Sequence, residues 1–171
     1  MLRDRLESSD FNHVQLVIAG GYDELVVENR EYYKELQARA SELQLDKRVT
    51  FLRNIDATQK RLLMTNATCL LYTPDREHFG IVPVEAMHAK CPVIAVNSGG
   101  PCETVVDGQT GLLRNNTPDD FASAMQRFIG DDGLKLKNRL GNAGKKRVQD
   151  CFSFQVFTEK LDNIISSLHS N

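Results

Sequence analysis

The sequence predicts an α/β fold, a Rossmann-like, doubly wound parallel sheet, and two observations support that prediction. Short apolar runs rich in β-branched residues alternate along the chain with longer segments of helical periodicity. The 171 residues are 41% hydrophobic and 26% charged, which suits about one globular domain. Strands separated by helices form βαβ units, so we expect the strands to be parallel and covered by helices.

Each element follows in order along the chain. The apolar runs predict strands at residues 14–19, 49–52, 68–72, 92–96 and 111–113. Helical spacing predicts helices over residues 29–43, 56–67, 81–90, 118–129, 134–150 and 154–168. Asp56, Thr117 and Ser153 are expected to cap three of these helices. Pro83 is compatible with its helix because it falls in the first turn.

Composition excludes several classes of function. The 21 basic and 23 acidic residues give a net charge of −2, so the chain has no bulk attraction for nucleic acid or anionic lipid. No apolar run approaches the ~20 residues that a membrane-spanning helix needs. The four cysteines and four histidines show no metal-ligand spacing. We therefore expect no nucleic-acid partner, no membrane span and no metal site in this chain.

In open α/β sheets, ligands bind beyond the carboxyl ends of the strands. The loops of interest are therefore residues 20–23, 53–56, 73–80 and 97–101.

The segment from Glu77 to Glu85 carries the most unusual chemistry. Gly80 precedes the predicted helix, so the free N–H groups of Gly80, Ile81 and Val82 form an anion site suited to a diphosphate. A carboxylate beside a phosphate is unfavourable unless hydroxyl groups donate to it, as sugars do. The spacing therefore suggests a nucleotide sugar with one carboxylate for each sugar ring. The structural alternative is that Glu77 caps the helix while Glu85 is merely solvated.

Glu77 and Glu85 form an E-x7-E pair around Phe79-Gly80-Ile81. The segments that continue the pattern are Glu85-Ala86-Met87, Pro92-Val93-Ile94-Ala95, Gly99-Gly100-Pro101, Glu103-Thr104-Val105 and Thr110-Gly111-Leu112-Leu113. This order resembles the retaining glycosyltransferases of family 4, which have two Rossmann-like domains, over nearly the whole chain. The segments 77–83 and 97–101, with Gly20-Gly21-Tyr22-Asp23, resemble in particular the eukaryotic members that transfer mannose from GDP-mannose to a dolichol-diphosphate-linked oligosaccharide during asparagine-linked glycan assembly.

The resemblance implies a role for each site residue. Glu77 is the expected catalytic residue, because it would bind the transferred mannose and position its anomeric carbon. Glu85 would accept hydrogen bonds from the ribose hydroxyls. The amides of Phe79, Gly80, Ile81 and Val82 would hold the diphosphate, with no cofactor or metal beyond the donor GDP-mannose. Residues with weaker signals for donor binding are Gly20, Gly21, Arg53, Asn54, Gly99 and Gly100.

The resemblance also implies a larger protein. Residues 1–171 would be a carboxyl-terminal nucleotide-sugar-binding domain that lacks its first strand, and the acceptor-binding domain would be absent. Strands 14–19 and 68–72 are then expected to have unpaired edges, and the chain alone is expected to be inactive. The full-length enzyme is expected at the cytoplasmic face of the endoplasmic reticulum. Two alternatives stay open: a family 4 enzyme that uses a UDP-sugar, and a nucleotide-binding remnant without catalysis.

Overall fold

The computed structural model describes residues 1–169, and its contacts divide the chain into two compact units. The amino-terminal unit comprises residues 7–61, and the carboxyl-terminal unit comprises residues 1–6 together with the chain from residue 62 onward. The boundary falls within helix α4 (Ala57–Asn66). The sequence did not predict this division, because it shows no linker between the units.

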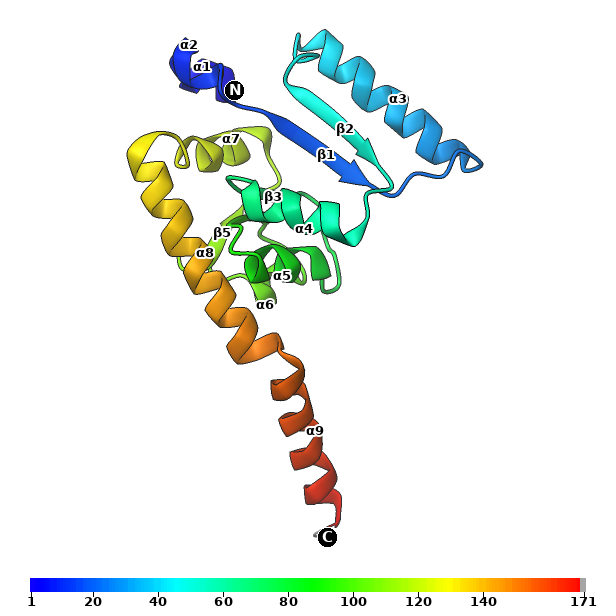
Figure 1. Ribbon diagram of the computed structural model, residues 1–171, viewed down its shortest axis with the longest axis vertical. Coiled ribbons are helices and arrows are strands. Elements are labelled where there is room, and N and C mark those ends of the chain that lie inside the picture. The colour runs from blue at the N-terminus through cyan, green and yellow to red at the C-terminus, as the bar shows by residue number, and fades with distance from the viewer. Residues whose placement is uncertain (170–171) are drawn as a thin grey trace. The chain divides into compact units, whose positions relative to one another are not determined.

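The amino-terminal unit contains a two-stranded parallel sheet and one long helix. Its elements are α2 (Ser8–Phe11), β1 (Leu16–Gly20), α3 (Val27–Glu42) and β2 (Val49–Arg53). Leu16 pairs with Val49 at one end of the sheet and Gly20 pairs with Arg53 at the other. Helix α3 runs alongside the two strands (Figure 1). Of the β1 residues only Ile18 is half-buried, and the others are exposed.

The carboxyl-terminal unit contains a three-stranded parallel sheet with the order β3-β4-β5. Its strands are β3 (Leu70–Tyr72), β4 (Val93–Val96) and β5 (Gly111–Arg114). Its helices are α1 (Leu2–Arg5), α5 (Ile81–His88), α6 (Pro101–Thr104), α7 (Pro118–Gln126), α8 (Gly130–Phe152) and α9 (Phe154–His169). Each predicted strand is therefore present within two residues of its predicted ends.

The central strand β4 is buried along its whole length. Val93 and Ala95 join a core cluster with Met87 of α5, whereas Ile94 and Val96 join a second cluster with residues of α7. Successive side chains of a strand point to opposite faces, so helices cover both faces of this sheet. This arrangement confirms the predicted doubly wound α/β fold for the carboxyl-terminal unit.

The three predicted caps are also confirmed. Asp56 Oδ1 accepts a hydrogen bond from the Gln59 amide at 2.8 Å, and Gln59 Oε1 accepts one from the Asp56 amide at 3.0 Å. Thr117 Oγ1 accepts from the Asp120 amide at 3.2 Å. Ser153 Oγ accepts from the Val156 amide at 3.3 Å. These short polar side chains satisfy amides that would otherwise lack partners at the start of each helix.

Other features differ from prediction or extend it. Helix α8 begins at Gly130 instead of residue 134, and α2 and α6 were not predicted. Among the described residues, β1 pairs only with β2 and β3 pairs only with β4. Strands β1 and β3 therefore each keep one edge that pairs with no described strand.

Two of the thiols are poor nucleophiles near neutral pH. Burial raises the pKa of Cys91 to about 11 and that of Cys69 to about 12. Cys102 is exposed, and its thiol donates to Asn97 Oδ1 at 3.3 Å. Neither Cys69 nor Cys91 is a candidate for thiolate chemistry.

Candidate functional site

The predicted anion site forms where the loop after β3 enters helix α5. Gly80 is the N-cap of α5 and has a φ of 69°, in the left-handed region that favours glycine. A Cβ on Gly80 would lie 2.8 Å from the hydroxyl oxygen of Tyr72, so a side chain there would force the Tyr72 ring to shift. Ile81 and Val82 follow as the first helical residues, whose amides have no partner within the helix. An anion at this end would also be favoured by the helix dipole.

The structural alternative predicted that Glu77 caps α5, but the Glu77 side chain has other partners. Its Oε1 accepts a hydrogen bond from the adjacent His78 amide at 3.0 Å. Its Oε2 lies 3.5 Å from the Tyr72 hydroxyl, which donates to it. Glu85 stands one turn into α5 and is half-buried instead of fully solvated. Glu77 thus precedes the helix start and Glu85 follows it, although their roles toward a ligand stay predictions.

The pKa of Tyr72 depends on the neighbouring Glu77 carboxylate. Burial raises the pKa of Tyr72, and the charge of Glu77 and the hydrogen bond to it raise that pKa further. Glu77→Gln removes the charge but not the burial, so we expect the Tyr72 pKa to fall yet stay above its ordinary value of 10. A pH titration of the Tyr72 ring carbon by NMR measures this change. Glu159→Gln, on the exposed surface of α9, should leave the titration unchanged, and an equal shift in both variants would contradict the assigned contact.

The turn after β4 packs directly against the loop that carries Glu77. The Gly100 amide donates to the Glu77 carbonyl oxygen at 2.7 Å, and the Arg76 amide donates to Ser98 Oγ at 3.1 Å. A Cβ on Gly99 would lie 2.3 Å from the Glu77 carbonyl oxygen, and one on Gly100 would lie 2.2 Å from that of Phe79. Glycine is therefore required at both positions by backbone packing. The Gly100 amide already donates to the Glu77 carbonyl oxygen, so Gly100 influences the site by holding the loop that carries Glu77.

Phe79 ties the same loop to the end of α8. Its ring meets that of Phe152 edge-to-face, with 6.0 Å between centroids and 73° between planes. The Arg147 guanidinium lies 5.7 Å from the Phe152 ring centroid. It also donates to the carbonyl oxygens of Glu103 and Thr104, each at 2.7 Å. Phe79 is 40% exposed, so this packing covers the residue only in part.

The remaining predicted residues lie together in the amino-terminal unit. The side chain of Asn54, a residue with a φ of 54°, accepts from the Tyr22 amide at 2.7 Å and donates to the Tyr22 carbonyl at 2.8 Å. The Arg53 guanidinium lies 4.6 Å from the Tyr22 ring centroid. A Cβ on Gly20 or Gly21 would meet nothing within 4 Å. Asn54 therefore shapes the 20–23 loop, and contact between these residues and a donor stays a prediction.

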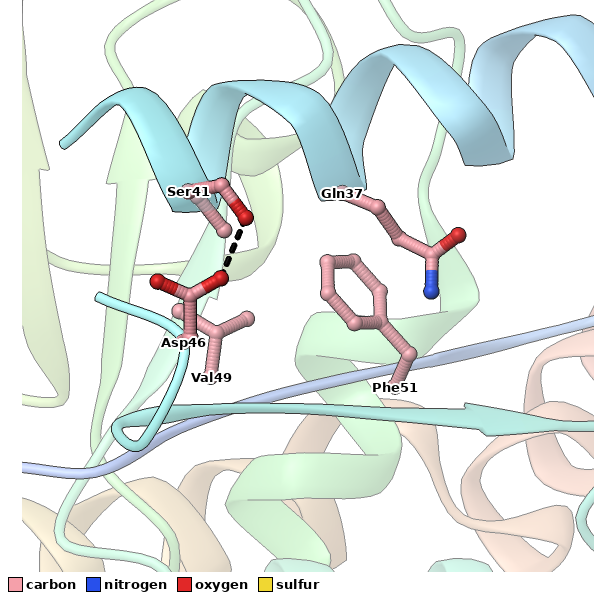
Figure 2. Close-up of a pocket in the computed structure, with 6 residues that line it drawn as sticks. Gln37, Ser41, Asp46, Val49 and Phe51 are labelled. Carbon is pink, nitrogen blue, oxygen red and sulfur yellow. Dashed lines mark hydrogen bonds between the residues drawn. The ribbon is translucent and has the colours of Figure 1, made fainter. Parts of the chain in front are cut away.

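A pocket of about 230 Å³ lies in the amino-terminal unit, between α3 and β2. Its lining residues are Gln37, Ala40, Ser41, Asp46, Val49 and Phe51. Figure 2 shows the Ser41 hydroxyl turned toward the Asp46 carboxylate, to which it donates a hydrogen bond. None of these residues belongs to the predicted donor site. Across residues 1–169, no three His, Cys, Asp or Glu side chains gather as metal ligands would.

Sequence reasoning missed the contacts that hold the site in place. Tyr72 ends strand β3, and only its position next to a candidate loop could have drawn attention to it. Ser98 contacts a residue 22 positions away, a pairing that no local spacing predicts. Phe152 is the last residue of α8, and its contact with Phe79 follows only from tertiary packing.

Comparison with known proteins gives a consistent result. The family model described as "Glycosyl transferases group 1" matches residues 3–147. The chain is 48% identical over 167 residues to the alpha-1,3/1,6-mannosyltransferase ALG2 of Homo sapiens, covering 98% of this chain and 40% of that protein. It is 50% identical over 157 residues to ALG2 of Dictyostelium discoideum, covering 92% of this chain and 37% of that protein. The chain thus spans about 40% of the length of such relatives.

Solved structures share the fold. A sucrose-phosphate synthase from Thermosynechococcus elongatus matches with a TM-score of 0.80 and 30% identity, over 91% of this chain and 39% of that one. Anabaena Alr3699/HepE, in complex with UDP-glucose, matches with a TM-score of 0.78 and 27% identity, over 90% of this chain and 41% of that one. Both likenesses extend across nearly the whole of this chain. In the described part of this chain, no helix is both long and apolar enough to cross a membrane.

Proposed function

Because the chain belongs to the glycosyl transferases group 1 family, we propose that it binds the sugar donor of a retaining mannosyltransferase. Its fold is that of one Rossmann-like lobe of a GT-B glycosyltransferase. The observation that carries the proposal is the start of α5, where a left-handed Gly80 separates Glu77 from Glu85. The donor is GDP-mannose, and the acceptor is a dolichol-diphosphate-linked oligosaccharide. The names of the ALG2 relatives support mannose transfer.

The geometry suggests how the donor is held. The amides at Phe79, Gly80, Ile81 and Val82 receive the diphosphate, because the first turn of a helix presents unpaired N–H donors and the positive end of its dipole. Glu85 accepts hydrogen bonds from the ribose hydroxyls. Glu77 accepts them from hydroxyls of the mannose and so positions its anomeric carbon.

The same N–H groups also assist the chemical step. As the bond from mannose to phosphate breaks, negative charge grows on the departing diphosphate. Fixed N–H groups stabilise that charge without having to reorganise. The departing phosphate takes the proton of the acceptor hydroxyl, which attacks from the same face, so the configuration is retained. No carboxylate needs to act as nucleophile, unlike in retaining glycosidases.

The acceptor and the cellular location belong to the whole enzyme. We place that enzyme at the cytoplasmic face of the endoplasmic reticulum, where it would act on a dolichol-linked oligosaccharide held by residues outside this chain. The ALG2 relatives are about 2.5 times as long by the 40% share that this chain covers, which supports an acceptor site outside these residues.

A second candidate donor is a UDP-sugar. The likeness to Alr3699/HepE in complex with UDP-glucose favours it, because that protein shares the fold at 27% identity. The start of α5 selects for a diphosphate and two sugar rings but not for the base. Donor choice therefore depends on residues other than Glu77 and Glu85.

Isothermal calorimetry of the 171-residue chain with GDP, UDP, ADP and GDP-mannose tests the proposal. We expect binding of GDP and GDP-mannose, and preferential binding of UDP would favour the second candidate. Glu85→Ala should weaken GDP binding ~10- to 100-fold, because hydrogen bonds to a charged acceptor contribute about 1.5–3 kcal/mol.

Glu159→Ala provides the matched control, since it removes an exposed glutamate from α9 and should leave the affinity unchanged. Unchanged GDP affinity in Glu85→Ala would refute the ribose assignment. Failure of the wild-type chain to bind any of the four ligands would refute the donor-binding role.

A further inference from the structure

We propose that Ser98 is a positioning residue that acts through Glu77: its hydroxyl holds the Arg76–Glu77 backbone so that the Glu77 carboxylate faces the donor sugar. This inference rests on the proposed function. It adds a residue that touches no part of the donor and yet governs the sugar-binding carboxylate.

Two hydrogen bonds from the turn after β4 flank Glu77. On one side the Arg76 amide donates to Ser98 Oγ at 3.1 Å, and on the other the Gly100 amide donates to the Glu77 carbonyl oxygen at 2.7 Å. Arg76 has a φ of 57°, which a residue with a side chain adopts at an energetic cost. The bond to Ser98 therefore stabilises a conformation that Arg76 would otherwise leave.

The turn is tied to the sheet, whereas the first part of the loop is exposed. The Ser98 amide donates to the Val96 carbonyl at 2.9 Å, and the Asn97 amide donates to the Arg114 carbonyl at 2.8 Å. These bonds tie the turn to β4 and β5, and β4 is buried along its whole length. Residues 73–76 of the loop are all exposed. Because the core fixes the turn, the turn sets the position of the loop.

The Ser98 hydroxyl reaches the backbone next to Glu77, and the Glu77 side chain has its own contacts with His78 and Tyr72. Losing the hydroxyl releases the Arg76 amide to water and allows the peptide before Glu77 to rotate. The carboxylate then spends less time facing the sugar. Glu85 stands on α5, whose residues Pro83, Val84, Ala86 and Met87 are buried, so the ribose contact is expected to change little.

The test measures affinities of the 171-residue chain for GDP-mannose and for GDP by calorimetry. We expect Ser98→Ala to weaken GDP-mannose binding about five-fold, the loss of one hydrogen bond, and GDP binding by less than about two-fold. In a Glu77→Ala background, Ser98→Ala should have no further effect on GDP-mannose, because the two residues act as a unit. Ser98→Thr, which keeps the hydroxyl, should restore most of the affinity.

Ser123→Ala, on the exposed face of α7, is the matched control and should bind both ligands like the wild type. Equal melting temperatures of the variants would show that the fold is retained. The positioning role is overturned if Ser98→Ala behaves like Ser123→Ala, if it weakens GDP and GDP-mannose equally, or if its effect adds to that of Glu77→Ala. A wild-type chain that binds neither ligand refutes the proposed function and this role together, whereas normal wild-type binding with a silent Ser98→Ala refutes this role alone.

Discussion

Gly100→Ala is expected to weaken nucleotide-sugar binding about 100-fold and to destabilise the chain by about 1–3 kcal/mol. A Cβ at this position would lie 2.2 Å from the Phe79 carbonyl oxygen and 2.4 Å from the Phe79 Cα. These are backbone atoms, which cannot rotate aside as the end of a side chain can. The loop must therefore move away from the turn, and the Phe79 and Gly80 amides move with it. Calorimetry with GDP-mannose measures the loss.

Gly141→Ala separates this local effect from general destabilisation. A Cβ on Gly141 would lie 2.2 Å from the Lys90 carbonyl oxygen, which is a clash of the same kind. Lys90 follows the carboxyl end of α5, whereas Gly80 precedes the amino end of that helix. We expect a similar loss of stability but nearly normal binding at a temperature where the variant is folded. Gly100→Ala with wild-type affinity, or equal losses of affinity in both variants, would contradict the role of the turn.

Leu140→Ala is expected to lower the free energy of unfolding by ~2–5 kcal/mol. Leu140 of α8 is 0% exposed and packs in the cluster that contains Ile94 and Leu112. Removing its side chain loses buried apolar surface and leaves a cavity between α8 and the sheet. Such a loss is a large part of the 5–15 kcal/mol that stabilises a typical domain. Urea unfolding followed by circular dichroism measures it.

The matched control is on the same helix. Leu134 is 59% exposed, so Leu134→Ala should change stability by less than about 0.5 kcal/mol. Similar unfolding midpoints for Leu140→Ala and Leu134→Ala would mean that α8 does not pack on the sheet as described.

The features that sequence predicted well have local causes. Asp56, Thr117 and Ser153 cap helices because a short polar side chain reaches an amide within three residues. The Glu77–Glu85 segment was found for a similar reason, since a glycine between a strand and a helix creates free amides. Each of these signals is contained in fewer than ten neighbouring residues.

The features that it missed depend on distant contacts. The Arg76–Ser98 bond spans 22 positions, and the division into two units follows from how contacts are distributed over the whole chain. Helix α8 was predicted to begin at residue 134. It begins at Gly130, where the two aspartates lie in the first turn and interact favourably with the helix dipole. A Cβ on Gly133 would lie 2.2 Å from the Phe128 carbonyl carbon, so that glycine permits close packing.

The exposure of β1 has a consequence for the time scale on which backbone amides exchange with solvent. A two-stranded sheet whose first strand is largely exposed opens at little energetic cost, whereas β4 opens only when both core clusters come apart. In deuterated water, amides of β1 and β2 should therefore take up deuterium well before those of β4. One part of the chain would then stay closed over long times, while another part repeatedly opens and closes.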